Sequence, residues 1–97
     1  MNLTVRLREE AEQDIEAASW YERQKLGLGH DFLDSLSLLL HSLPEQPLQY
    51  QIIYKNFRRA LLHRFPFGVY YSIDGDSIIV YAVMHASRDR KRWQGRT

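Results

Sequence analysis

The sequence of 97 residues predicts a small α+β domain, with a helical hairpin on one face of a mainly antiparallel sheet. Three observations predict it. Apolar residues recur at helical spacing in the first half of the chain. After residue 50 they alternate with polar residues, and turn residues separate the alternating segments. The expected order is β-α-α-β-β-β-β, in one domain over residues 1–97 without internal repeat or linker.

The first two elements are a strand and a helix. Leu3-Thr4-Val5-Arg6-Leu7 alternates apolar and polar residues, as a half-buried strand does. An acidic segment that suits a helix N-terminus follows, and Gly27 ends the helix. The predicted apolar face of this helix consists of Ala11, Ile15, Ala18 and Tyr21.

A second helix is predicted from Asp31 to Leu43, before Pro44. Its apolar stripe consists of Phe32, Leu33, Leu36, Leu39, Leu40 and Leu43. Because about four residues connect the two helices, we expect them to form an antiparallel hairpin.

Four strands are predicted after this hairpin, over residues 50–54, 57–65, 69–73 and 77–84. Lys55-Asn56 is expected to turn between the first two, and Asp74-Gly75-Asp76 between the last two. The tail from Ala86 onward is polar and basic, and no element is predicted for it.

Composition excludes several classes of function. The chain has no cysteine, so disulfide scaffolds, thiolate zinc sites and thiol nucleophiles are absent. Its four histidines lack metal-ligand spacing, and we expect neither a metal nor another cofactor. No apolar run approaches the length of a membrane span, and the N-terminus does not read as a signal peptide. We therefore expect a cytoplasmic domain.

The net charge of +1 conceals a division between the two halves of the chain. Residues 1–50 carry four basic and nine acidic residues, a net of −5, whereas residues 51–97 carry nine basic and three acidic, a net of +6. Either the second half meets an anionic partner, such as nucleic acid or an acidic protein segment, or the halves pair with each other.

Short motifs along nearly the whole chain resemble the RelE/ParE superfamily of toxins, and most of all its ParE-like branch. These motifs are Ala11-Glu12-Gln13-Asp14-Ile15, Trp20-Tyr21-Glu22-Arg23-Gln24, Gly27-Leu28-Gly29, Arg58-Arg59, Phe65-Pro66-Phe67 before Val69-Tyr70-Tyr71, and the segment from His85 to Trp93. The resemblance implies the toxin of a bacterial type II toxin–antitoxin pair, with the strand and helix order predicted above. It also implies a small antitoxin whose disordered C-terminal segment folds across the toxin.

The two branches differ in chemistry, and the sequence bears on the choice. RelE-like members resemble metal-independent ribonucleases that cut messenger RNA in the ribosome, whereas ParE-like members poison DNA gyrase. At the five positions implied for the nuclease, only Arg59 and Arg88 match. The other three hold Leu61, Gly68 and Trp93 in place of a lysine, an arginine and a tyrosine. This comparison predicts a lost nuclease site and a toxin that is not an enzyme.

If the chain is a nuclease, its candidate catalytic residues are Arg59, His85 and Arg88. His85 ends a predicted strand beside Arg88, where it could contact phosphate or fix the tail to the sheet. His63 lies within a predicted strand, and we expect it to be buried and hydrogen-bonded. His30 and His41 are expected on the surface of the helices.

The predicted target- or antitoxin-binding residues are Arg58, Arg59, Arg64, Arg88, Arg92 and Trp93. We expect Trp93 to pack back on the sheet and to aim Arg88 and Arg92 outward. Trp20 either covers a helix edge or forms part of a partner surface.

Three hypotheses follow: a gyrase poison held by its antitoxin, a ribosome-dependent messenger-RNA endonuclease, or a degenerate member that only binds its antitoxin. The assembly expected is a homodimer or a toxin–antitoxin heterotetramer.

Overall fold

The computed structural model describes residues 3–87 and 90–96. Its elements are β1 (Thr4–Leu7), α1 (Glu9–Leu26), α2 (Gly29–Ser42), β2 (Ile52–Tyr54), β3 (Phe57–Leu61), β4 (Phe67–Asp74), β5 (Ser77–His85) and α3 (Arg90–Gln94). The predicted order of one strand, two helices and four strands is confirmed, and α3 is an addition to it. None of the helices in these ranges is long and apolar enough to cross a membrane.

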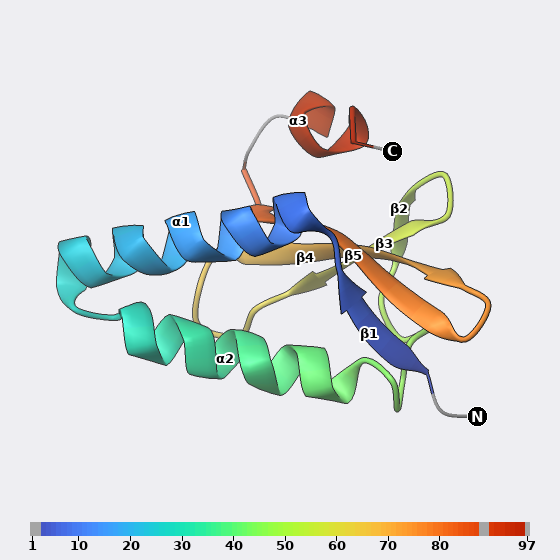
Figure 1. Ribbon diagram of the computed structural model, residues 1–97, viewed down its shortest axis with the longest axis horizontal. Coiled ribbons are helices and arrows are strands. Elements are labelled where there is room, and N and C mark those ends of the chain that lie inside the picture. The colour runs from blue at the N-terminus through green and yellow to red at the C-terminus, as the bar shows by residue number, and fades with distance from the viewer. Residues whose placement is uncertain (1–2, 88–89, 97) are drawn as a thin grey trace.

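The five strands form one mixed sheet in the order β1-β5-β4-β3-β2. β1 pairs in parallel with β5, and the other neighbours are antiparallel. The antiparallel hairpin of α1 and α2 runs along one side of the sheet, and α3 stands apart from it at the C-terminal end of the chain (Figure 1). The α+β architecture predicted from the alternation and spacing of apolar residues is therefore correct.

Each face of the sheet has its own apolar cluster. The cluster on the helical side contains Ala11, Ala18, Phe32, Leu36, Leu43, Ala60, Leu62, Phe65, Phe67, Val69, Tyr71, Ile78, Val80 and Val83. A smaller second cluster contains Phe57, Tyr70, Ala82, Met84 and Trp93, with Tyr54 and Tyr81 packed against it. The register between β4 and β5 shifts at Tyr70 and Tyr71, which leaves Tyr81 without an opposite residue. Tyr81 and Ala82 consequently both contribute to the second cluster.

The prediction that Tyr21 belongs to the core is wrong. Tyr21 is 52% exposed, whereas the adjacent Glu22 is 8% exposed. The C-terminal turns of α1 extend past the strands (Figure 1), so the face that buries Ala11 and Ala18 has no sheet beneath it at Tyr21.

The third predicted strand is shorter than expected. β3 ends at Leu61, and the amide of Leu62 donates to the carbonyl oxygen of Phe67 at 2.9 Å, which closes a loop through Pro66. His63 therefore lies in this loop and is exposed, contrary to the prediction of a buried histidine within a strand. Since the chain reverses here, Phe65 turns back into the core on the helical side.

Candidate functional site

Three of the five positions compared with nucleases lie together on the sheet face opposite the helical hairpin. Arg59 is opposite Tyr70 and Leu61 is opposite Gly68 in the β3–β4 pairing. A Cβ atom at Gly68 would lie 3.1 Å from Cγ of Arg59 and 3.3 Å from Cε2 of Tyr70. The missing side chain of Gly68 thus leaves room for the half-buried Arg59 to lie across β4.

Trp93 covers the same face. Its ring is 2% exposed and stacks on Tyr70 at a centroid distance of 4.6 Å. The rings of Phe57 and Tyr54 contact it edge-on at 6.0 and 5.7 Å. The prediction that Trp93 packs back on the sheet is confirmed, and Arg92 is exposed beside it as expected. Arg88 lies outside the described residues.

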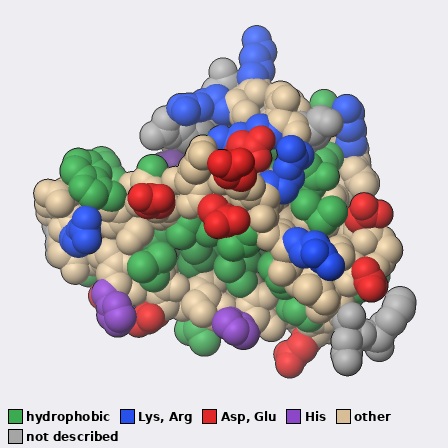
Figure 2. All heavy atoms as spheres, viewed as in Figure 1, with side chains coloured by type: hydrophobic (Ala, Val, Ile, Leu, Met, Phe, Trp, Pro, Cys, Tyr) green, Lys and Arg blue, Asp and Glu red, His purple; other side chains and the backbone are tan. Residues whose placement is uncertain are grey.

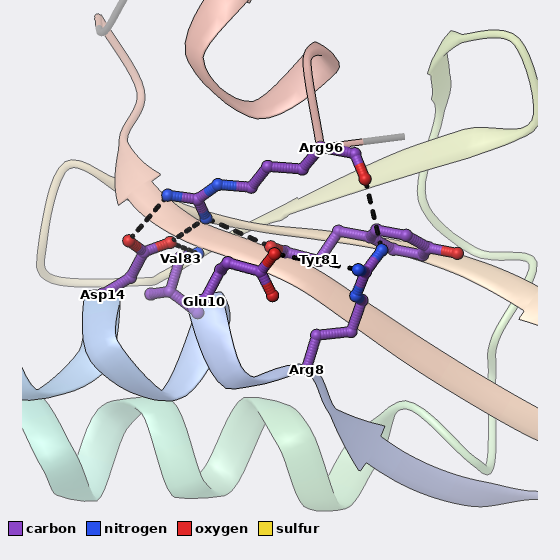
Figure 3. Close-up of polar contacts among 6 residues, drawn as sticks. All are labelled: Arg8, Glu10, Asp14, Tyr81, Val83 and Arg96. Carbon is purple, nitrogen blue, oxygen red and sulfur yellow. Dashed lines mark hydrogen bonds and ion pairs between the residues drawn. The ribbon is translucent and has the colours of Figure 1, made fainter.

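An ion pair that the sequence did not reveal joins the tail to α1 (Figure 3). The two guanidinium nitrogens of Arg96 donate to the two carboxylate oxygens of Asp14 at 2.7 and 3.2 Å. Arg96 also donates to the carbonyl oxygen of Tyr81 at 3.2 Å, and the amide of Val83 donates to Asp14 at 3.0 Å. We call Asp14 and Arg96 the C-terminal clasp.

The C-terminal clasp satisfies backbone groups at the edge of β5. β1 pairs with β5 only as far as Val80, so the backbone of Tyr81 and Val83 lies beyond its last partner on that side. Asp14 and Arg96 supply the acceptor and the donor that a longer β1 would have supplied. Arg8 donates to the carbonyl oxygen of Arg96 at 3.2 Å and lies over the ring of Tyr81 at 4.9 Å.

A groove of about 850 Å³ lies between the C-terminal half of α1, the loop before β4 and α3. We call it the α1–α3 groove. Its apolar lining includes Trp20, Tyr21, Phe65, Phe67 and Met84. Its charged lining consists of three basic residues, Lys25, Arg64 and Arg92, and two acidic ones, Asp14 and Glu22. Trp20 is 56% exposed, and hydrophobic atoms gather on the surface over this end of α1 (Figure 2). Trp20 therefore lines a groove with much of its side chain exposed, and a role in a partner surface stays a prediction.

The predicted arginines do not form one surface. Arg58 donates to the carbonyl oxygens of Tyr50 at 2.6 Å and of Leu48 at 3.3 Å, so it fixes the segment before β2. Arg64 lies 3.9 Å from Asp31 of α2 and 5.7 Å from the ring centre of Phe65. Arg59 and Arg58 are neighbours in β3 and therefore point to opposite faces of the sheet.

His85 serves the turn after β5. Its Nδ1 accepts a hydrogen bond from the amide of Ser87 at 3.2 Å and lies 2.7 Å from the Ser87 hydroxyl. Its ring packs against Phe67 at 5.5 Å. His30 and His41 are on the helix surfaces, as predicted. Within residues 3–87 and 90–96, no group of histidines and acids could hold a metal ion.

Comparison with known proteins identifies the family. A model described as the ParE toxin of type II toxin–antitoxin system, parDE, matches residues 5–90. No curated protein matches the chain in sequence.

Several solved structures share the fold, among them the following two. A chain of the chromosomal ParDE system from P. aeruginosa has a TM-score of 0.77 at 15% sequence identity, covering 86% of this chain and 95% of that chain. A chain of the toxin–antitoxin complex RelBE2 from Mycobacterium tuberculosis has a TM-score of 0.61 at 18% identity, covering 88% and 99%. The resemblance to the RelE/ParE superfamily is confirmed, and the chain belongs to the ParE toxin family of type II toxin–antitoxin systems.

Proposed function

We propose that this ParE-family toxin arrests growth by binding DNA gyrase, without cleaving RNA, and that a cognate antitoxin neutralises it. The observation that carries the proposal is the composition of the sheet face around Arg59. RNA cleavage requires a base for the 2′-hydroxyl, an acid for the leaving oxygen and cations for the phosphate.

This face is poorly equipped for that chemistry. Leu61 is an exposed apolar side chain, Gly68 has no side chain, and the indole of Trp93 is buried and exchanges no proton near neutral pH. Among the described positions that were compared with nucleases, Arg59 is the one that carries a positive charge. His85 is engaged with Ser87 and Phe67 at the far end of β5.

The α1–α3 groove supports an antitoxin partner. The similar structures are those of a ParDE system and of a RelBE2 toxin–antitoxin complex. The groove combines exposed aromatic rings with Lys25, Arg64 and Arg92, which suits an acidic amphipathic segment. Arg64 and Arg92 were both predicted as binding residues from the sequence, and we propose that role for them in this groove.

Controlled expression in a tolerant bacterial host tests the target. We expect filamentous cells and cleaved DNA covalently linked to gyrase, with messenger RNA intact. A host with a toxin-resistant gyrase is the matched control and should grow. Messenger-RNA cleavage with intact DNA would overturn the proposal and favour the endonuclease with Arg59, His85 and Arg88. No growth effect would favour a degenerate member.

Co-expression with the reading frame adjoining the toxin gene tests the groove. Trp20→Ala and Arg64→Glu should each reduce rescue of growth, because they remove an aromatic contact and reverse a charge in the groove. Leu38→Ala is the matched control, since Leu38 is 75% exposed and lies on α2 away from the groove. Full rescue of both groove variants would show that the antitoxin binds elsewhere.

A further inference from the structure

The short helix α3 depends on tertiary contacts for its position. It has five residues, which is too short for a helix to be stable by itself in water. Two of its described contacts are well defined: Trp93 is stacked on Tyr70, and Arg96, just beyond the helix, is bound to Asp14. The first is apolar and the second is ionic.

The C-terminal clasp has the geometry of a strong ion pair. Both nitrogens of the Arg96 fork meet both oxygens of Asp14, which is the bidentate arrangement. The side chains are 21% and 15% exposed, so salt screens this pair less than it would a surface pair. The amide of Val83 donates to Oδ2 of Asp14, the oxygen that the shorter contact of Arg96 also reaches, so β5 helps to hold the carboxylate in place.

The C-terminal clasp also adjoins the α1–α3 groove. Asp14 and Val83 line the groove, and Arg92 contributes to its wall from within α3. The amide of Arg96 donates to the carbonyl oxygen of Trp93 at 3.0 Å, so the contact that fixes Arg96 also fixes the end of α3, the helix that carries Arg92. If α3 left the sheet, the groove would lose its basic wall on that side.

We infer that Asp14 and Arg96 are positioning residues that assemble the α1–α3 groove, by holding α3 against α1 and β5 where an acidic antitoxin segment binds. The inference rests on the proposed antitoxin function. It assigns to the C-terminal clasp a role in partner binding that operates through the position of Arg92.

Fluorescence of Trp93 tests whether the clasp holds α3. In a Trp20→Phe background Trp93 is the remaining tryptophan, and its burial should protect its fluorescence from quenching by acrylamide. Asp14→Asn and Arg96→Gln should raise the quenching constant several-fold, whereas Arg96→Lys, which keeps the charge but not the fork, should be intermediate. Asp14→Asn keeps an oxygen that can accept from the amide of Val83. The matched controls are Glu12→Gln and Arg23→Gln, which remove the same charges from exposed positions on α1.

Binding to the purified product of the adjoining reading frame tests whether the clasp assembles the groove. Positioning predicts that Asp14→Asn and Arg96→Gln both weaken binding about tenfold, since the contact made through Arg92 is lost. A direct electrostatic effect predicts the opposite for Asp14→Asn, because removing a negative charge from the groove would favour an acidic ligand. The sign of the change separates the two explanations.

Each outcome is decisive. Quenching that stays at the parent value in both clasp variants overturns the claim that the clasp holds α3. Raised quenching with unchanged or tighter binding overturns the claim that the clasp assembles the groove. If the wild-type chain does not bind the adjoining product, the antitoxin function fails and takes the role of the groove with it, while the quenching measurement still decides whether the clasp holds α3.

Discussion

Trp93 covers the sheet face opposite the helical hairpin and packs on its aromatic side chains. The sequence comparison predicts that it replaces a tyrosine of the nuclease branch, and its indole is buried against Tyr70. An aromatic residue in a polar tail predicts a docking contact, and the structure identifies the rings that receive it. At this position the side chain stabilises the fold and leaves no exposed group for acid–base chemistry.

Replacement of Trp93 by Ala should lower the free energy of unfolding by about 3 kcal/mol, the low end of the range for a buried tryptophan. The low end applies because Trp93 belongs to the smaller second cluster and makes no part of the larger cluster on the helical side. Urea denaturation measures the change, and Trp93→Phe is the control that should retain most of the stability. A Trp93→Ala chain as stable as the wild type would contradict the packing described here.

Tyr71 gives the fold a specific dependence on alkaline pH. Its hydroxyl donates to the carbonyl oxygen of Pro47 at 2.6 Å. Burial raises the pKa of Tyr71 from 10.0 to about 12, against the opposing effect of the nearby Arg58 charge. Because the folded pKa is above the unfolded one, the stabilisation is fully present below pH 10 and is lost as the pH rises toward 12.

Two units of pKa difference correspond to about 2.8 kcal/mol in total, and about 2 kcal/mol of it should be lost between pH 10 and 12, because neither titration is complete at the ends of this range. Urea midpoints measured from pH 9 to 12 follow it. Tyr71→Phe should be less stable at neutral pH by about 1 kcal/mol, through the lost hydrogen bond. It should also show a flatter decline above pH 10, and an equal slope in both chains would contradict the assignment to Tyr71.

Among the elements, the crossing of α1 and α2 depends on one glycine. Gly27, with φ of 69°, ends α1, and α2 begins at Gly29. A Cβ atom at Gly29 would lie 2.9 Å from the backbone oxygen of Ser19 and 2.9 Å from Cβ of Arg23. Neither neighbour is the flexible end of a side chain, so the helices would have to separate.

We expect Gly29→Ala to destabilise the protein by about 1–3 kcal/mol, the range for overpacking. Thermal or urea denaturation measures the change. Leu38→Ala, on the exposed side of α2, is the control and should change the stability by less than about 0.5 kcal/mol. A neutral Gly29→Ala would mean that the helices can adjust their crossing without loss.

At the scale of the whole molecule, the acidic first half and the basic second half meet at two described ion pairs. Asp14 binds Arg96 and Asp31 lies near Arg64, so part of the division between −5 and +6 is used within the fold. Exposed cations also remain at the α1–α3 groove, where Lys25 and Arg92 lie. Of these two cations only Arg92 belongs to the basic half, whereas Arg64 both lies near Asp31 and lines the groove, so pairing within the fold and a basic groove occur in the same molecule.

Association with an acidic antitoxin should consequently depend on salt. We expect the association rate constant to fall about tenfold between about 0.05 and 0.5 M NaCl, while the dissociation rate constant changes less. Stopped-flow or surface-based kinetics measure both. Arg92→Gln should reduce the salt dependence, and an association rate independent of salt would exclude electrostatic steering by this groove.

Sequence patterns predicted the larger elements because helical and strand periodicity are local properties. Ala11 and Ala18, one face of α1, are buried as their spacing predicted. The same pattern extended to Tyr21 failed, because periodicity does not reveal where the sheet beneath a helix ends. The strand predicted over 57–65 failed at Leu62 for a related reason: the loop closed by Phe67 interrupts an alternation that continues in the sequence.

The sequence by itself determined the order of strands and helices, the charge division and the side chains at the positions compared with nucleases. Alternation along the strand already placed Arg59 and Leu61 on one face, but only the tertiary structure brought Gly68 beside them, buried Trp93 and formed α3. It also joined Asp14 to Arg96, which are 82 residues apart. The physical reason is the range of the interactions. Backbone propensity and periodicity act within a few residues, whereas the partners of a buried carboxylate or a stacked ring are chosen by the folded chain.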